Sequence, residues 1–166
     1  GGGRTLLPGL IDAHGHVMGL GLGERRVDVS ATASLQQALD AVRRHAAQSS
    51  EGWVLGRGWN QVRWNLPRFP TAAELDQVES QRPVWLVRVD GHAGWANSAA
   101  LQAAGIDRDT PDPAGGRIER DAHGEPSGIL IDAAMALVTQ QLPAPDARER
   151  EAMLDAALAS IARVGI

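Results

Sequence analysis

The chain has 166 residues and a formal net charge of −4 at pH 7, and its basic residues are scattered along the sequence. This distribution argues against a phosphate-binding surface and against nucleic acid as a partner. The absence of Cys excludes disulfides and thiolate metal ligands and favours a cytoplasmic protein, and no apolar run reaches the roughly 18 residues that a membrane span requires.

The first predicted element is a short buried strand at Leu10–Ile11, which follows a turn at Pro8-Gly9. In an extended strand Asp12, His14 and His16 project to the same side. Two imidazoles placed in this way can chelate one ion, and neutral imidazole is the commonest nitrogen ligand of zinc. The alternative is a pair of polar histidines at a strand end that bind no metal.

A glycine-rich stretch over 19–23 is predicted to be a loop, and a helix is predicted over about 34–48. Ser34 and Gln37 have the spacing of a capping box at its start. The apolar stripe of this helix consists of Leu35, Ala38, Leu39, Val42 and Ala46. A second strand is predicted over 53–56, between two glycines.

A short helix is predicted to begin at Thr71, with Glu74 completing a capping box, and to end before Pro83. The segment 84–89 is almost continuously apolar, as expected of a strand covered on both faces. The later elements are a helix from Asn97 or Ser98 to about 104, a loop over 109–116, a hairpin of strands at 117–120 and 127–131, and helices over about 133–141 and 146–164. Strands that alternate with helices predict a parallel α/β sheet, with the hairpin as an insertion.

Four segments resemble one enzyme family. The segment Pro8-Gly9-Leu10-Ile11-Asp12-Ala13-His14-Gly15-His16 is similar to the first-strand signature of the amidohydrolase superfamily. The segments 58–61 (Gly-Trp-Asn-Gln), 88–98 (Arg-Val-Asp-Gly-His-Ala-Gly-Trp-Ala-Asn-Ser) and 124–132 (Gly-Glu-Pro-Ser-Gly-Ile-Leu-Ile-Asp) resemble amidohydrolase family 3, the YtcJ-like metal-dependent hydrolases. The resemblance spans essentially the whole chain.

The resemblance implies an α/β fold, namely part of a (β/α)8 TIM barrel of the metal-dependent hydrolase type. Because a complete barrel needs about 250 residues, we expect residues 1–166 to be the N-terminal part of the catalytic barrel, truncated at both ends. The insertion, a β-hairpin with a helical segment, is expected at about 105–145. Strand edges and apolar faces that lack their barrel neighbours are expected to make this piece self-associate.

The function implied is hydrolysis of a C–N bond in a small amide-type, non-peptide substrate by a metal-activated water. His14 and His16 are the expected ligands of a divalent metal, zinc in the first place, as one or two ions. The remaining ligands and the general-base aspartate are expected after Ile166, so the piece alone is expected to be inactive. The alternative is a noncatalytic binding or scaffold domain with a vestigial metal site.

The resemblance also assigns roles to later residues. His92, after the buried strand, is expected to be catalytic, and the alternative is a histidine whose hydrogen bonds are satisfied by a neighbouring backbone group. Asp132 is expected to be a third metal ligand, with the N-cap of the following helix as the alternative.

Trp59, Trp95 and Asn97 are expected to contact the substrate. Core packing for Trp95 and helix capping for Asn97 are the alternatives. Asn60 departs from an acid that is common in the family, which removes a charge from this segment.

Overall fold

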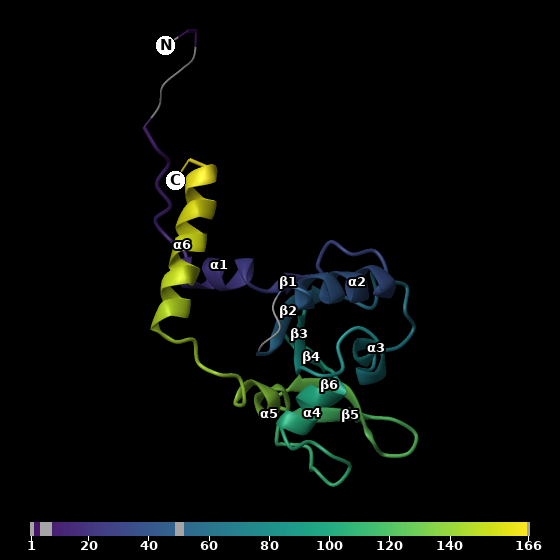
Figure 1. Cartoon of the computed structure of the whole chain (residues 1–166). Coiled ribbons are helices and arrows are strands. Elements are labelled where there is room, and N and C mark those ends of the chain that lie inside the picture. The colour runs from purple at the N-terminus through teal and green to yellow at the C-terminus, as the bar shows by residue number, and fades with distance from the viewer. Residues whose placement is uncertain (1, 4–7, 49–51, 166) are drawn as a thin grey trace. The chain divides into compact units, whose positions relative to one another are not determined.

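The computed structural model describes residues 2–3, 8–48 and 52–165 (Figure 1). The chain divides into two compact units. Unit 1 combines Gly1–Arg25 with Ala144–Ile166, and unit 2 is the continuous stretch Arg26–Pro143.

Unit 2 contains one six-stranded mixed sheet. Its strands are β1 (Val27–Asp28), β2 (Val54–Trp59), β3 (Val84–Arg88), β4 (Ala93–Ala96), β5 (Gly116–Arg120) and β6 (Pro126–Asp132). They are arranged in the order β1-β2-β3-β4-β6-β5. The first three strands are parallel, whereas the pairs β3/β4, β4/β6 and β6/β5 are antiparallel.

The parallel sheet that was predicted is present in β1, β2 and β3, but β4, which was not predicted as a strand, runs antiparallel to β3. Only residues 89–92 separate β3 from β4, which is far too short for the crossover that a parallel pair needs. The predicted hairpin is confirmed as β5 and β6, and β6 continues the sheet by pairing with β4.

The helices that the structure describes in unit 2 are α2 (Leu35–Ala46), α3 (Ala72–Asp76), α4 (Ser98–Ala103) and α5 (Met135–Thr139). In Figure 1, α2 lies beside β1 and β2, and α4 and α5 lie near β6. Alternate side chains of β3 enter two different cores, because Val84 and Leu86 pack in the cluster that includes α2, and Trp85 packs in the cluster that includes α4.

Three helix starts in unit 2 confirm the capping predictions. The Ser34 hydroxyl accepts a hydrogen bond from the Gln37 backbone N–H at 3.2 Å. Thr71 and Glu74 form a reciprocal capping box at α3. The Asn97 side chain accepts from the Ala100 N–H at 2.9 Å and caps α4.

Unit 1 contains α1 (Val17–Glu24) and α6 (Ala147–Arg163), which pack against each other. The predicted loop over 19–23 is wrong, because these residues lie within α1. Close packing explains the helix despite its glycines: a Cβ on Gly21 would lie 1.8 Å from the carbonyl oxygen of Met153. The Ser160 hydroxyl also donates to Glu24 Oε1 at 3.1 Å.

The predicted buried strand at Leu10–Ile11 is also wrong. No strand includes these two residues, and their side chains are 66% and 93% exposed. A strand needs a neighbour that pairs with it along its length. Leu10 N–H donates to Gly165 O at 2.7 Å, and the described part of the chain offers this segment no paired strand.

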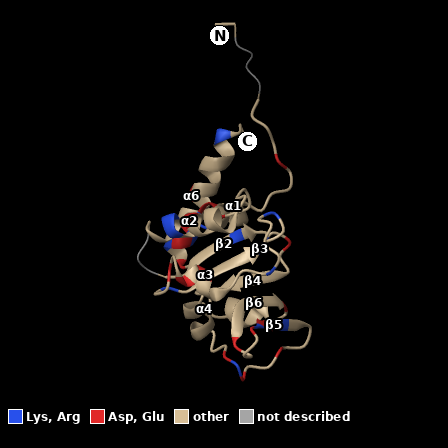
Figure 2. Ribbon diagram, turned by 90° about the vertical axis from the view of Figure 1, so that its right-hand side faces the viewer, with Lys and Arg blue, Asp and Glu red and all other residues tan. Residues whose placement is uncertain are grey.

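Charged residues of both signs are interspersed along the ribbon (Figure 2). Within unit 2 several of them form ion pairs, such as Arg57 with Asp28 at 3.0 Å and Arg82 with Glu79 at 2.7 Å. Among the helices that the structure describes, none has both the length and the apolar character needed to cross a bilayer.

Candidate active site

The predicted site residues fall into two groups, one in each unit. His14 and His16 belong to unit 1, whereas His92 and Asp132 belong to unit 2. Each group has its own local geometry.

The rings of His14 and His16 lie close together, just before α1. Their centroids are 5.5 Å apart and their planes meet at 85°. The backbone here bends at residues 13–14 and forms no strand, and Asp12 Oδ1 accepts a hydrogen bond from the His14 N–H at 2.9 Å. Both histidines are exposed, so their imidazoles are open to solvent.

This pair fits a metal as two ligands of a larger set. Two imidazoles bound to one tetrahedral ion have ring centres about 5 Å apart, which agrees with the observed spacing. Within the described residues there is no group of three or more His, Cys, Asp or Glu side chains able to hold an ion. The spacing of the two rings is thus compatible with two ligands of one ion, and metal binding by His14 and His16 stays a prediction.

The structure brings His92 and Asp132 together where β4 begins and β6 ends, in the sheet of unit 2. His92 precedes β4, and Asp132 is the last residue of β6. His92 Nδ1 lies 2.8 Å from Asp132 Oδ1, and the Asp132 N–H donates to the His92 carbonyl oxygen at 3.0 Å. The two side chains are 76% and 51% exposed.

Asp132 does not cap the following helix. The N-cap of α5 is Ala134, and it makes no side-chain capping bond. This excludes the capping alternative for Asp132, whose carboxylate instead contacts the His92 imidazole. Asp132 has a left-handed backbone, with φ of 48°, a conformation that Asp adopts more readily than most residues. Metal ligation by Asp132 stays a prediction.

A second carboxylate, that of Asp90, binds the backbone of His92. Asp90 Oδ1 accepts from the His92 backbone N–H at 3.1 Å, and its other oxygen pairs with Arg88. Burial alone would raise the pKa of Asp90, but the His92 N–H and the Arg88 guanidinium together hold that pKa below its usual value.

The polar cluster extends to Gln61. Arg88 Nε donates to Gln61 Oε1 at 3.1 Å, and the Arg88 guanidinium lies 5.6 Å from the centre of the Trp59 ring. Arg88 and Gln61 were not predicted as site residues from the sequence. Their positions could have indicated them: Gln61 follows the carboxyl end of β2, and Arg88 is the last residue of β3. Open α/β sheets commonly bind ligands at the carboxyl ends of their strands.

Trp59 and Trp95 lie in the core of unit 2. Both are fully buried, and their ring centroids are 6.2 Å apart. The Trp59 indole N–H donates to Leu86 O at 2.9 Å, and the Trp95 indole N–H donates to Thr71 O at 2.8 Å. Substrate contact by these side chains stays a prediction, and their burial favours core packing.

Asn97 is fully buried and uses both ends of its amide. Its oxygen accepts from the N–H groups of Val84 and Ala100, each at 2.9 Å. Its nitrogen donates to the carbonyl oxygens of Glu79 and Arg82 at 2.8 and 2.9 Å. These four bonds favour the capping alternative, and substrate contact by Asn97 stays a prediction.

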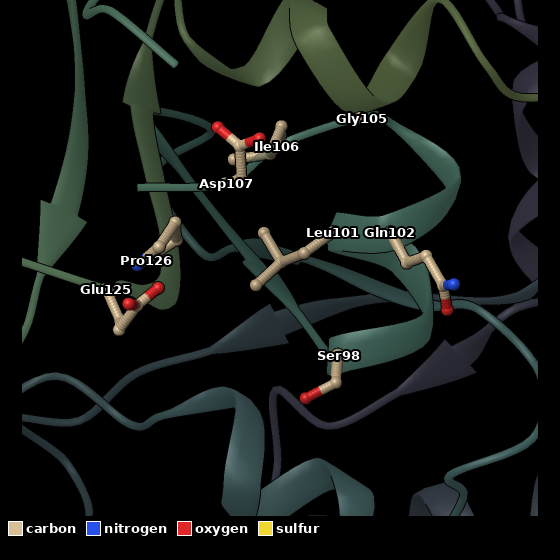
Figure 3. A pocket seen from close by; sticks show the side chains of 8 residues that line it. All are labelled: Ser98, Leu101, Gln102, Gly105, Ile106, Asp107, Glu125 and Pro126. Atoms are coloured by element: carbon tan, nitrogen blue, oxygen red, sulfur yellow. The ribbon is translucent and has the colours of Figure 1, made fainter. Parts of the chain in front are cut away.

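A shallow cavity of about 420 Å³ lies elsewhere in unit 2, between α4 and the loops before β5 and β6. Figure 3 shows Ser98, Leu101 and Gln102 on the helix side and Asp107 and Glu125 on the loops. It contains none of the predicted site residues.

Comparison with known proteins identifies the family. The amidohydrolase family model matches residues 2–166. The chain is 42% identical over 142 residues to the putative amidohydrolase YtcJ of Bacillus subtilis (strain 168), covering 85% of this chain and 27% of the relative. It is 41% identical over 139 residues to the N-substituted formamide deformylase of Arthrobacter pascens, covering 82% of this chain and 26% of that protein.

The fold resembles the crystal structure of an uncharacterized metal-dependent hydrolase from Pyrococcus horikoshii OT3, with a TM-score of 0.69 and 20% identity. The match covers 96% of this chain and 29% of that one. The chain spans about a quarter of the length of the curated relatives it matches. The match to the family model over nearly all of its residues shows that the chain belongs to the amidohydrolase family.

Proposed function

We propose that the protein carrying this chain is a metal-dependent hydrolase that cleaves a C–N bond in a small amide-type, non-peptide substrate. The observation that carries the proposal is the spacing of the His14 and His16 rings, which suits two ligands of one ion. Membership of the amidohydrolase family supports hydrolysis, and the name of the Arthrobacter relative, an N-substituted formamide deformylase, supports an amide-type substrate.

In this proposal His14 and His16 hold a divalent metal, with zinc in the first place. Such an ion supplies a nucleophilic water at neutral pH and polarises the substrate carbonyl. The exposure of both imidazoles leaves them accessible to further ligands and to solvent. The surrounding fold in the whole protein is proposed to be a (β/α)8 barrel, to which this chain contributes one part.

His92 is proposed to contact the substrate or the reacting atoms. Its side chain is the most accessible of the polar cluster formed by Gln61, Arg88, Asp90, His92 and Asp132, at 76% exposure. The backbone bonds to Asp90 and Asp132 fix the position from which the imidazole projects. Because the described residues provide an incomplete ligand set, we expect the 166-residue chain alone to be inactive.

The test measures hydrolysis of N-formyl and N-acyl amides by the protein carrying this chain, loaded with zinc, before and after His14→Ala. We expect turnover to fall by more than about 100-fold, together with loss of bound metal measured by mass spectrometry. His123→Ala, in the exposed hairpin turn, is the matched control and should retain both. Unchanged turnover in the His14→Ala protein would contradict the proposal.

One observation favours the noncatalytic alternative. Within the described residues, only the imidazoles of His14 and His16 come together at the proposed metal site, and no third ligand side chain joins them. A scaffold domain with a vestigial site would bind no zinc and hydrolyse no amide in the whole protein. The same metal analysis therefore separates the two functions.

A further inference from the structure

The side chain and backbone of His92 are held at three points. Asp132 Oδ1 lies 2.8 Å from the imidazole Nδ1, and the Asp132 backbone N–H donates to the His92 carbonyl oxygen at 3.0 Å. The third bond runs from the His92 N–H to Asp90 Oδ1 at 3.1 Å. One residue, Asp132, thus binds both the backbone and the ring of His92.

The backbone of Asp132 is part of this arrangement. The antiparallel pairing of β4 with β6 aligns Ala93 with Ile131, so His92 and Asp132 are the next residues outward at the same edge. Asp132 has a left-handed φ of 48°. For a residue other than glycine this conformation costs free energy, which the surrounding structure must offset.

The chemistry of the contact determines where the imidazole proton lies. An ionised carboxylate only accepts hydrogen bonds, so Nδ1 of a neutral His92 must carry the proton to bond with Asp132. Nε2 then keeps its lone pair. Since the His92 side chain is 76% exposed, this lone pair is open to an approaching N–H or O–H donor.

We propose that Asp132 is a positioning residue that fixes His92 in the Nδ1–H tautomer and so presents Nε2 as a hydrogen-bond acceptor for an N–H-bearing substrate. The tautomer follows from the contact itself. Only the use of Nε2 on an amide substrate rests on the proposed function. This role differs from the metal ligation that the family resemblance implied for Asp132.

The location agrees with a ligand-facing role. His92 follows β3 at the edge where β2 and β3 end, and the two apolar residues that unit 2 exposes most, Val62 at 68% and Val89 at 56%, follow the same two strand ends. An acceptor nitrogen that follows the same strand ends as exposed apolar side chains suits a small substrate that has an amide N–H and an apolar substituent.

The test reads the tautomer of His92 directly. In the ¹⁵N-labelled 166-residue chain at about pH 8.5, where an ordinary imidazole is neutral, long-range ¹H–¹⁵N spectra distinguish Nδ1–H from Nε2–H. A His92→Gln variant identifies the signals of this residue. An imidazole without a partner in water favours the Nε2–H form, so we expect the wild-type chain to show the opposite preference.

Asp132→Asn keeps the size and the left-handed tolerance of the side chain but removes the obligatory acceptor, because an amide can also donate. We expect the ratio of Nδ1–H to Nε2–H to fall about two- to tenfold, the range expected when one hydrogen bond is lost. Asp109→Asn, another exposed carboxylate of unit 2, is the control and should leave the ratio unchanged.

Two results would overturn the proposal: an Nε2–H form of His92 in the wild-type chain, or an unchanged ratio in Asp132→Asn. The first is read in the wild-type chain, with His92→Gln used only to assign the signals, so it does not depend on how Asp132→Asn folds. Neither measurement needs metal or substrate. A failure of the proposed hydrolase activity therefore leaves the tautomer result standing, and the reverse also holds.

Discussion

The carboxylate of Glu79 organises the turn that leads into β3. It accepts from the backbone N–H groups of Gln81 and Arg82 at 3.0 and 3.1 Å and from Arg82 Nη2 at 2.7 Å. Burial alone would raise the pKa of Glu79, but the Arg82 guanidinium and the two backbone N–H groups lower it below its usual value. The Glu79 side chain is only 12% exposed, so solvent screens these bonds weakly.

Glu79→Gln is expected to lower the free energy of unfolding at pH 7 by about 1 to 3 kcal/mol, because bonds to a charged group are lost. A carboxyl whose pKa is lowered in the folded state stabilises the protein fully above its unfolded pKa of about 4.5, and this contribution disappears as the pH falls through the folded value. The difference between wild type and variant should therefore shrink below about pH 4.5.

Urea unfolding at pH 7 and at pH 3 measures both effects. Glu151→Gln, on the exposed side of α6, serves as the control and should change the free energy of unfolding by less than about 0.5 kcal/mol at either pH. An equal loss for Glu79→Gln at both pH values would show that packing rather than charge is responsible.

At the scale of single residues, the sequence predicted hydrogen bonds between near neighbours in the chain better than hydrogen bonds to distant residues. A side-chain cap at Asn97 could be predicted because capping depends on residues three positions apart. Its bonds to Val84, Glu79 and Arg82 could not, since they join segments 13 to 18 residues away in the chain. For the same reason the contact of the His92 imidazole with the Asp132 carboxylate, 40 residues apart, was not predicted.

At the scale of elements, α1 shows how packing determines the role of a glycine. A Cβ on Gly21 would overlap the Met153 backbone of α6, whereas a Cβ on Gly23 in the same helix would meet no atom within 4 Å. The two positions therefore separate helix propensity from helix packing.

Gly21→Ala is expected to destabilise the α1–α6 pair by about 1 to 3 kcal/mol, the usual cost of overpacking. Gly23→Ala makes the same chemical change without a clash and should stabilise α1 by about 0.5 to 1 kcal/mol. Urea unfolding followed by circular dichroism at 222 nm, the wavelength of the helix signal, compares the two variants. If both variants shifted stability in the same direction, the close contact of α1 with α6 would be contradicted.

The predicted elements succeeded where local signals were strong. The start of α4 follows from the Asn97 cap, its end at Ala103 lies close to the predicted end at about 104, and α6 begins at Ala147, close to the predicted start at about 146. The two-residue strand β1 is too short to have a periodicity. Strand β4 has the sequence Ala-Gly-Trp-Ala, with weak strand propensity, and it forms because β3 and β6 pair with it on either side.

At the scale of the whole molecule, the two units differ in how much apolar surface they bury. Among the described residues, the buried hydrophobic side chains of unit 1 are Met153 and Ala157, whereas unit 2 contains both large hydrophobic clusters. Unit 1 exposes most of the large apolar side chains that are open to solvent: Leu10, Ile11, Met18, Leu20, Leu154, Leu158 and Val164. Self-association of the chain stays a prediction, and this exposure favours it.

Amide hydrogen exchange should therefore be at least about tenfold faster in α1 and α6 than in β3 and β4, because local opening is easiest where little apolar surface is buried. Mass spectrometry of peptic fragments measures the rates. The surface loop 109–116 serves as an internal reference for fast exchange. Equal protection of both units would contradict the expected difference in stability.

Motif resemblance predicted the family from short segments, and the match to the family model confirms it. The sheet topology was not predictable in the same way. Alternating strand and helix patterns do not distinguish a parallel neighbour from an antiparallel one when the deciding feature is a four-residue connection such as 89–92.

The continuous stretch of unit 2 interrupts unit 1 in the sequence, and this has a consequence during synthesis. A ribosome releases Arg26–Pro143 before Ala147–Arg163. The six-stranded sheet can therefore assemble before α6, the helix that packs against α1, has been synthesised. Until unit 2 has folded, joining α1 to α6 requires closing a long flexible loop, at an entropic cost that a folded insert reduces. Nascent chains stalled before residue 147 should therefore hold a protease-resistant core with an unprotected amino-terminal arm.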